Sequence, residues 1–268
     1  MTAARRFACG LVSAVFLLAM SADFIAPASY ERQFRELPNA PPSRQFPLGT
    51  DELGRDRLSR LLYGSRVSLL LAPAAAAIAT LLALTIGLVA GYAGGIVERL
   101  LLGATDLLAS MPGLFLLFTL RAILPLNVAP LISVCVTFTL LALLGWTSGA
   151  RVIRAAVLQA KGSDYMLQAR AVGCRPLRLA FVHVAASLRP VLTAQFWVCV
   201  PIFLLAEASL GMLGLGITEP LPSWGNLLSE LQNYRALVDA PWLLAPAALL
   251  VAVLGSLQFI FADREVGQ

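Results

Sequence analysis

Long apolar runs alternate with polar segments along the whole chain. The runs contain at most one charged residue each and cover residues 7–26, 67–92, 100–120, 128–150, 191–213 and 242–262. Each reaches the length of about 20 residues that an α-helix needs to cross a bilayer. The pattern predicts an all-α integral membrane protein with six transmembrane helices and with both termini on one side.

The composition agrees with this class. Of 268 residues, 59% are hydrophobic and 13% are charged, whereas soluble domains carry about 25% charged residues. The net charge of +5 lies in the segments between the apolar runs. No basic stripe is interleaved with exposed aromatic residues, so the charge indicates membrane orientation and contact with membrane lipid, and not a nucleic-acid partner.

The first run follows Arg5 and Arg6, so it is either a signal peptide or a retained helix. It is long for a signal-peptide core, and the small-residue site near Ala26 is weak, which favours a retained helix with a cytoplasmic N-terminus. The predicted divisions are an N-terminal transmembrane helix (1–26), an external segment (27–66), a core (67–262) with a cytoplasmic loop (151–190), and a cytoplasmic tail (263–268).

The external segment is rich in proline and in charges of both signs, which excludes a span. Gly49-Thr50-Asp51 predicts a turn. Either Thr50 or Asp51 is expected to cap a short helix that continues through Leu62.

A basic loop separates the fourth and fifth runs. Residues 151–189 carry seven Lys or Arg and a single acid, Asp164. Ser163 is expected to cap a short helix with Asp164 in its first turn, Gly173 to end that helix, and Pro176 to begin a second one.

The second short helix places Leu177, Phe181, Val184 and Leu188 on one face. From the residues alone, two interpretations stay open. Two helices joined at a glycine can form a compact knob that presses into a partner protein. Alternatively, an amphipathic hairpin can lie on the lipid headgroups with its arginines on anionic lipid.

Asp106 and Glu207 each lie inside an apolar run. A charge at that depth is costly, so both are expected to face the bundle interior or a water-filled path. Asp106 lies near the predicted start of its helix, which favours a structural hydrogen bond. Glu207 precedes the stretch from Gly214 to Trp224, whose glycines and prolines predict a structured outside loop or a re-entrant turn.

The sequence contains no catalytic constellation. The four cysteines are far apart and His183 is the only histidine, so no disulfide framework, metal site or cofactor is expected. Lys161, the only lysine, is followed by Gly and not by Ser or Thr, so no nucleotide-binding P-loop can be built around it. If this chain takes part in ATP-driven transport, the ATPase must therefore be another subunit.

Four ordered motifs of polar residues occur along residues 45–262. They are Pro47-Leu-Gly-Thr-Asp-Glu-Leu-Gly-Arg-Asp56 with Leu58-Ser-Arg60, Gly91-Tyr-Ala-Gly-Gly95 with Asp106 and Met111-Pro112, Tyr165 to His183, and Glu207 to Gly216 with Pro222-Ser-Trp-Gly-Asn226. Together they resemble the permease subunits of bacterial ABC importers, in the C-type branch of the dipeptide, oligopeptide and nickel group.

The resemblance implies the six-helix fold of a type I importer permease in the bacterial inner membrane. The implied partners are a second homologous permease subunit, ATP-binding cassette ATPase subunits and an extracytoplasmic solute-binding protein. The basic loop matches the family's EAA loop, which docks in the ATPase. The helix signals and the resemblance together give the candidate site residues: Ser163, Asp164, Tyr165, Gln168, Ala169, Arg170, Gly173, Pro176, Leu177 and Phe181 in that loop, and Asp51, Arg55, Asp56, Trp224 and Asn226 in the external loops.

The chain departs from the family pattern at three places. Leu167-Gln168-Ala169 stands where the family has its EAA triplet, Ala185-Ala186 where it has leucine-proline, and Phe46 where it has histidine. Because of these departures, the detailed contacts of the loop with an ATPase do not follow from the family pattern. The position of the loop in the chain still follows from it.

A transporter permease is the favoured function, and a membrane scaffold or channel that uses its basic loop on lipid is the alternative. A membrane-bound enzyme would need a nucleophile–base pair or a metal set, which the sequence lacks. The motifs do not distinguish a peptide from a related small solute such as a nickel complex, because peptide permeases and nickel permeases share them.

Overall fold

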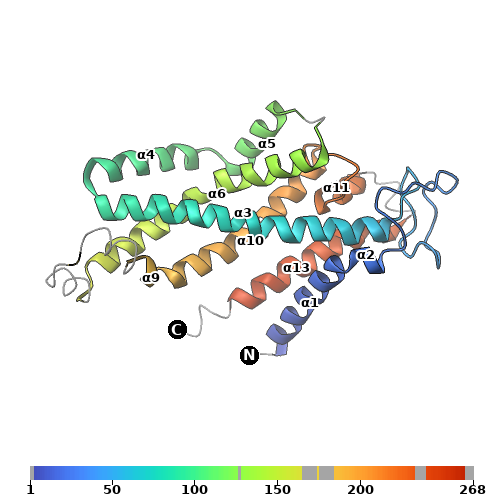
Figure 1. The fold of residues 1–268 in the computed structure, drawn as a ribbon, viewed down its shortest axis with the longest axis horizontal. Coiled ribbons are helices and arrows are strands. Elements are labelled where there is room, and N and C mark those ends of the chain that lie inside the picture. The colour runs from blue at the N-terminus through green and yellow to red at the C-terminus, as the bar shows by residue number, and fades with distance from the viewer. Residues whose placement is uncertain (1–2, 126–127, 165–173, 175–183, 233–239, 263–268) are drawn as a thin grey trace. The chain divides into compact units, whose positions relative to one another are not determined.

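A computed structural model describes residues 3–125, 128–164, 174, 184–232 and 240–262 (Figure 1). These residues are mainly helical, which confirms the all-α prediction. The elements in chain order are α1 (Ala3–Met20), α2 (Ala22–Ile25), α3 (Arg57–Ala93), α4 (Gly95–Ser110), α5 (Gly113–Ile123), α6 (Pro130–Lys161), α9 (Ala185–Ser187), α10 (Arg189–Met212), α11 (Trp224–Ser229), the 3-10 helices η2 (Glu230–Gln232) and η3 (Pro241–Leu244), and α13 (Ala245–Ala262).

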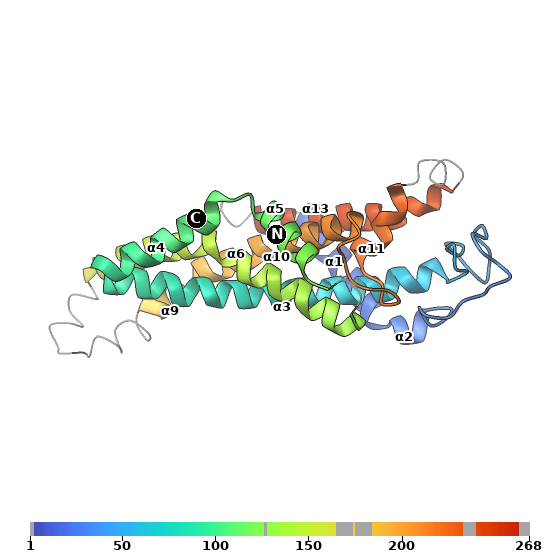
Figure 2. The same ribbon diagram turned by 90° about the horizontal axis from the view of Figure 1, so that it is seen from above.

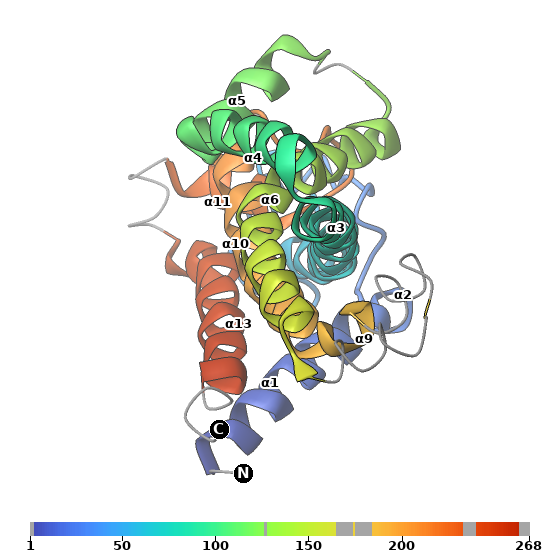
Figure 3. The same ribbon diagram turned by 90° about the vertical axis from the view of Figure 1, so that its left-hand side faces the viewer.

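The chain divides into two compact units. The first contains Met1–Ala72, Ala122–Thr137 and Leu204–Gln268, and the second contains Pro73–Arg121 and Phe138–Phe203. In the first unit, α1 lies side by side with α13 (Figure 1, Figure 3), and α11 packs against α13. The buried side chains of α1 are the small Ala8 and Ala19. Phe7, Phe16, Leu17 and Leu18 of this helix are exposed, as expected of a helix that faces lipid.

In the second unit, α4 runs back alongside the end of α3 (Figure 2). The chain reverses at Gly94 and Gly95, whose φ angles of +69° and +59° lie in the left-handed region. Glycine adopts this region without steric cost because it has no Cβ. A longer loop between the two helices is therefore not required for the reversal.

The second unit also packs α6 tightly on α3. A Cβ at Gly87 would lie 2.7 Å from the Ala150 carbonyl oxygen, and a Cβ at Gly91 would lie 2.8 Å from Val157 Cγ1. Glycines four positions apart occupy one helix face, so the two backbones can approach closely there. The core built around this contact contains Ala83, Leu88, Ala150, Ile153, Val157, Val184 and Leu188.

Among the described residues, five helices are long and apolar enough to cross a membrane, and α4 with α5 makes a sixth if this bent pair is one span. The prediction of a continuous third span over 100–120 is wrong, because α4 and α5 meet at an angle of 82°. The break is at Met111-Pro112. Proline has no N–H to donate and forces the preceding residue out of the helical region, and Met111 has φ −88° and ψ 139°.

Helix α3 has 37 residues and begins at Arg57, ten positions before the predicted span. At 1.5 Å per residue it is roughly 55 Å long, well beyond the bilayer core of about 30 Å. The predicted separate short helix before the span is therefore wrong, because its residues form the first turns of α3. Likewise, α6 continues through residues 151–161, where the sequence suggested the start of a loop.

Candidate functional site

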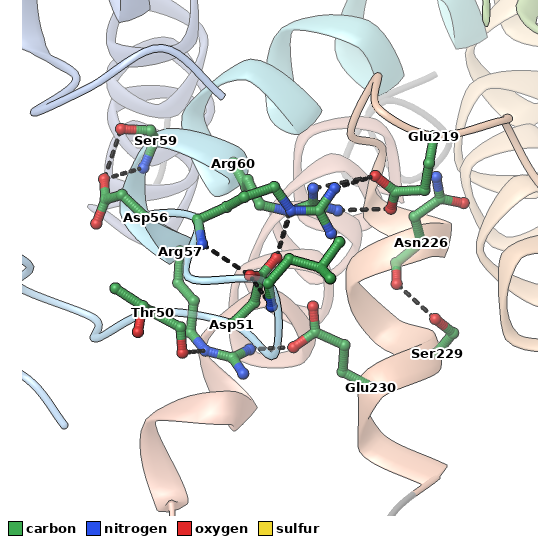
Figure 4. A network of polar contacts seen from close by, with 12 residues as sticks. Thr50, Asp51, Asp56, Arg57, Ser59, Arg60, Glu219, Asn226, Ser229 and Glu230 are labelled. Atoms are coloured by element: carbon green, nitrogen blue, oxygen red, sulfur yellow. Dashed lines mark hydrogen bonds and ion pairs between the residues drawn. The ribbon is translucent and has the colours of Figure 1, made fainter. Parts of the chain in front are cut away.

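Asp56 caps the first turn of α3. The prediction that Thr50 or Asp51 caps this helix is therefore wrong. Asp56 Oδ2 accepts hydrogen bonds from Ser59 N at 2.8 Å and from Ser59 Oγ at 2.5 Å (Figure 4). This is the bond that an N-cap carboxylate makes to the third residue of a helix. Asp56 and Ser59 are both fully buried.

Asp51 instead organises the turn before the cap. Its Oδ1 accepts from Leu53 N at 2.9 Å and from Arg55 N at 2.8 Å. Its Oδ2 accepts from Arg55 Nε at 2.6 Å and lies 3.7 Å from Arg60 Nε. One buried carboxylate therefore holds both the backbone of the turn and two guanidinium groups.

Glu219 completes this cluster from the segment that follows α10 (Figure 4). Its carboxylate accepts from Arg55 Nη1 at 2.6 Å and from Arg60 Nη2 at 2.7 Å. Burial raises the pKa of Glu219, but the hydrogen bonds and charges of Arg60 and Arg55 outweigh it, so the pKa lies below its ordinary value. We call Asp51, Arg55, Arg60 and Glu219 the Asp51 network.

A pocket of about 850 Å³ opens beside the network. Its wall includes an ion pair between Arg57 and Glu230, and Arg57 Nε also donates to the Thr50 carbonyl at 2.9 Å. Trp242 adds an apolar surface to the pocket. Most charged groups in this wall are already paired with each other, so the pocket offers mainly hydrogen-bonding groups.

Glu207 is fully buried, as predicted for an acid inside an apolar run. Its Oε1 accepts from the backbone N of Gly225 at 3.2 Å, and its Oε2 accepts from Ser68 Oγ at 3.2 Å. Ser68 Oγ in turn accepts from Trp224 N at 3.2 Å. Glu207 on α10 thereby ties the start of α11 to α3.

The contact between α10 and α11 depends on glycine. A Cβ at Gly225 would lie 2.6 Å from the Glu207 carbonyl oxygen and 3.0 Å from Gly211 Cα. Beside it, Asn226 Nδ2 donates to the Ile217 carbonyl at 2.7 Å, and Trp224 Nε1 donates to Ser65 Oγ at 2.8 Å. Trp224 and Asn226, both candidates from the sequence, therefore build a folded segment.

Asp106 differs from the expectation. It lies in the second half of α4 and not near the helix start, and its side chain is 64% exposed. It pairs with Arg151 Nε at 3.3 Å, and the Arg151 side chain is 47% exposed. Within this chain, Asp106 therefore does not face the bundle interior.

The basic loop is described only at its edges. Ser163 Oγ donates to the Ala160 carbonyl at 2.6 Å, at the end of α6, and Asp164 is exposed. The other loop candidates lie outside the described residues: Tyr165, Gln168, Ala169, Arg170, Gly173, Pro176, Leu177 and Phe181. The predicted capping role of Ser163 and the predicted helix end at Gly173 stay predictions.

Several members of the polar sites were not among the candidates from the sequence: Arg57, Arg60, Ser68, Glu219 and Glu230. Arg60 stood in a quoted motif without being selected, and Glu219 was visible as a lone acid in the glycine- and proline-rich stretch after α10. In the part of the chain that the structure describes, no group of three or more His, Cys, Asp or Glu side chains could hold a metal ion.

Residues 83–264 match the family described as "Binding-protein-dependent transport system inner membrane component". The chain is 32% identical over 244 residues to the oligopeptide transport system permease protein OppC of Bacillus subtilis (strain 168), which covers 90% of this chain and 77% of that protein.

Two further relatives are similar to a comparable degree. The dipeptide transport system permease protein DppC of the same Bacillus subtilis strain is 33% identical over 216 residues, covering 81% of this chain and 66% of that protein. The di/tripeptide transport system permease protein DppC of Pseudomonas aeruginosa (strain UCBPP-PA14) is 33% identical over 234 residues, covering 85% of this chain and 74% of that protein.

Proposed function

Because this chain belongs to the family of inner membrane components of binding-protein-dependent transport systems, the permeases of ABC importers, we propose that it forms half of a peptide translocation pathway. The family has the type I importer fold and spans the bacterial inner membrane several times. Its members are not enzymes, since a separate subunit carries the ATPase, and they work with a solute-binding protein.

Peptides are the proposed solute. The observation that carries this is the similarity to three permeases that are named for oligopeptides, dipeptides and di/tripeptides. A related small solute such as a nickel complex is the alternative, and it is kept as an outcome of the test.

A second, homologous permease subunit is proposed to supply the other half of the pathway. The Asp106–Arg151 pair supports this, because two half-exposed charges on apolar helices are costly against lipid. A partner helix or a water-filled path on that side would remove this cost. The exposed apolar side chains of α1 fit contact with membrane lipid.

We further propose that both termini and the loop 151–190 are cytoplasmic, and that this loop couples the chain to the ATPase. Segments 27–66 and 214–241 are then external and receive the solute from the binding protein. The Asp51 network supports a shared role for these two segments, because Glu219 of the second binds Arg55 and Arg60 of the first.

Reconstitution in liposomes tests the proposal. The purified chain alone should neither hydrolyse ATP nor accumulate a labelled dipeptide. Adding the partner permease, the ATPase subunits and the binding protein should produce both activities. Uptake of labelled Ni²⁺ in place of the dipeptide would support the alternative solute. ATP-driven uptake by the chain alone would overturn the assignment.

A further inference from the structure

The single lysine of the chain closes the end of a neighbouring helix. Lys161 is the last residue of α6, and its Nζ donates to the carbonyl oxygens of Gly91 at 3.2 Å and Tyr92 at 3.0 Å. Helix α3 ends one residue later, at Ala93. The last carbonyls of a helix have no partner within the helix, and the helix dipole favours a cation there. Lys161 therefore acts as a cationic cap on α3.

The same end of the second unit is held by two further contacts. The glycines of α3 allow α6 to pack closely against it at Gly87 and Gly91. About two turns before Lys161, Arg154 Nε donates to Glu98 Oε1 at 2.6 Å and so links α6 to α4. The end of α6 is thus bound to α3 and to α4 at once.

The chain returns to this same place in the last part of the basic loop. Val184 and Leu188 are buried in the core cluster that contains Leu88 of α3 together with Ile153 and Val157 of α6. Lys161 and Val184 flank the middle of the basic loop, so both ends of the segment between them are attached to one packed cluster.

The alternative role for Lys161 is contact with the membrane surface, where the amine of a lysine near a helix end often reaches the lipid headgroups. The geometry is different, because two backbone carbonyls and the Tyr92 ring, whose centroid lies 5.3 Å from Nζ, surround the amine. We propose that Lys161 is a positioning residue: it joins the start of the ATPase-coupling loop to the end of α3, so that a displacement of the loop moves α3 and α4 together with α6. This inference rests on the proposed coupling role of the loop.

Transport stoichiometry tests the inference in the complete reconstituted transporter. Lys161→Met keeps the length of the side chain and removes the cap, whereas Lys161→Arg keeps the cation. Lys161→Met should lower the dipeptide moved per ATP hydrolysed by about twofold to thirtyfold, the range that changes in a coupling network produce. Lys161→Arg should restore most of it.

Arg99→Met is the matched control for lost charge, because Arg99 is an exposed cation on α4, next to Glu98. It should leave the ratio of dipeptide to ATP close to that of the wild type. An unchanged ratio in Lys161→Met, with transport intact, would overturn the inference. A wild-type complex without ATP-driven uptake would instead overturn the proposed function.

Amine chemistry gives a second readout that does not require transport. Since the chain has one lysine, an amine-acylating reagent reports on one side chain besides the N-terminus. Lys161 should react several-fold more slowly than the amine introduced by Arg99→Lys. Its protection should also decrease in Tyr92→Ala. Equal reactivity of the two amines would mean that Lys161 is not engaged with α3, and the inference would be wrong.

Discussion

The Asp51 network and the ion pairs between α4 and α6 show two ways of using charge in one chain. In the network, Asp51, Arg55 and Arg60 are buried, and each carboxylate serves several donors. The α4–α6 pairs, Glu98–Arg154 and Asp106–Arg151, each join one acid to one arginine, and their side chains are 19–64% exposed.

The difference follows from what surrounds each set. The residues 39–56 form turns and not helices, so their shape depends on side-chain bonds to the backbone such as those of Asp51. Helix α6 is already held against α3 by glycine-mediated packing, and the ion pairs attach α4 to this packed pair of helices. Buried charges should therefore control folding in the first region, whereas exposed pairs should control little of the stability in the second.

The largest effect is expected for Asp51→Asn. This change leaves the buried guanidiniums of Arg55 and Arg60 short of negative charge, and breaking a buried ion pair costs about 3–5 kcal/mol. Thermal unfolding in detergent should show a large fall in Tm. Glu52→Gln, at the exposed neighbouring position, is the control and should change Tm little. Equal Tm values for the two variants would contradict the central role of Asp51.

A smaller effect is expected at Glu207. Glu207→Leu leaves the Gly225 N–H and the Ser68 hydroxyl buried without their acceptor, at a cost of about 1–3 kcal/mol. Glu207→Gln keeps an acceptor for Gly225 and should be milder. Tm and dipeptide uptake should both rank wild type above Gln and Gln above Leu. If both variants transport equally well, Glu207 neither ties the helices nor lines the pathway.

The pH dependence of stability should show the contribution of the Glu219 carboxylate. Its pKa in the folded protein lies below its ordinary value of 4.5, so its contribution is fully present above pH 4.5 and is lost as the pH falls through the folded value. Tm measured from pH 6 downward should therefore fall below pH 4.5, and less steeply in Glu219→Gln. The same acid sensitivity in both proteins would exclude Glu219 as its source.

The smallest effect on stability is expected for Asp106→Asn. Exposed ion pairs contribute less than about 1 kcal/mol, so Tm should stay close to that of the wild type. The substitution is chemically the same as Asp51→Asn, which makes the two variants a direct test of burial. A loss of stability at Asp106 as large as at Asp51 would mean that exposure does not separate the two regions.

Part of the fold was readable from local sequence. The lengths of the apolar runs predicted the membrane-crossing helices, since hydrophobic length is a property of one segment. The Asp56 cap and the break at Pro112 also have local causes, and both were visible in the residues although the prediction passed over them. Helix α3 was predicted too short because the prediction began it where the apolar run begins. The helix instead begins at Arg57, directly after the Asp56 cap.

The apolar runs, the polar motifs between them and the basic loop can thus be read directly from the residues, although the bend in the third run was not predicted. The pairings are visible only in the folded chain: Arg60 with Glu219, 159 positions away, Ser68 with Glu207, and Lys161 with the end of α3. The physical reason is that hydrophobicity, proline geometry and capping act within a few residues. A hydrogen bond between distant segments depends on how the helices pack, and no periodicity in either segment records its partner.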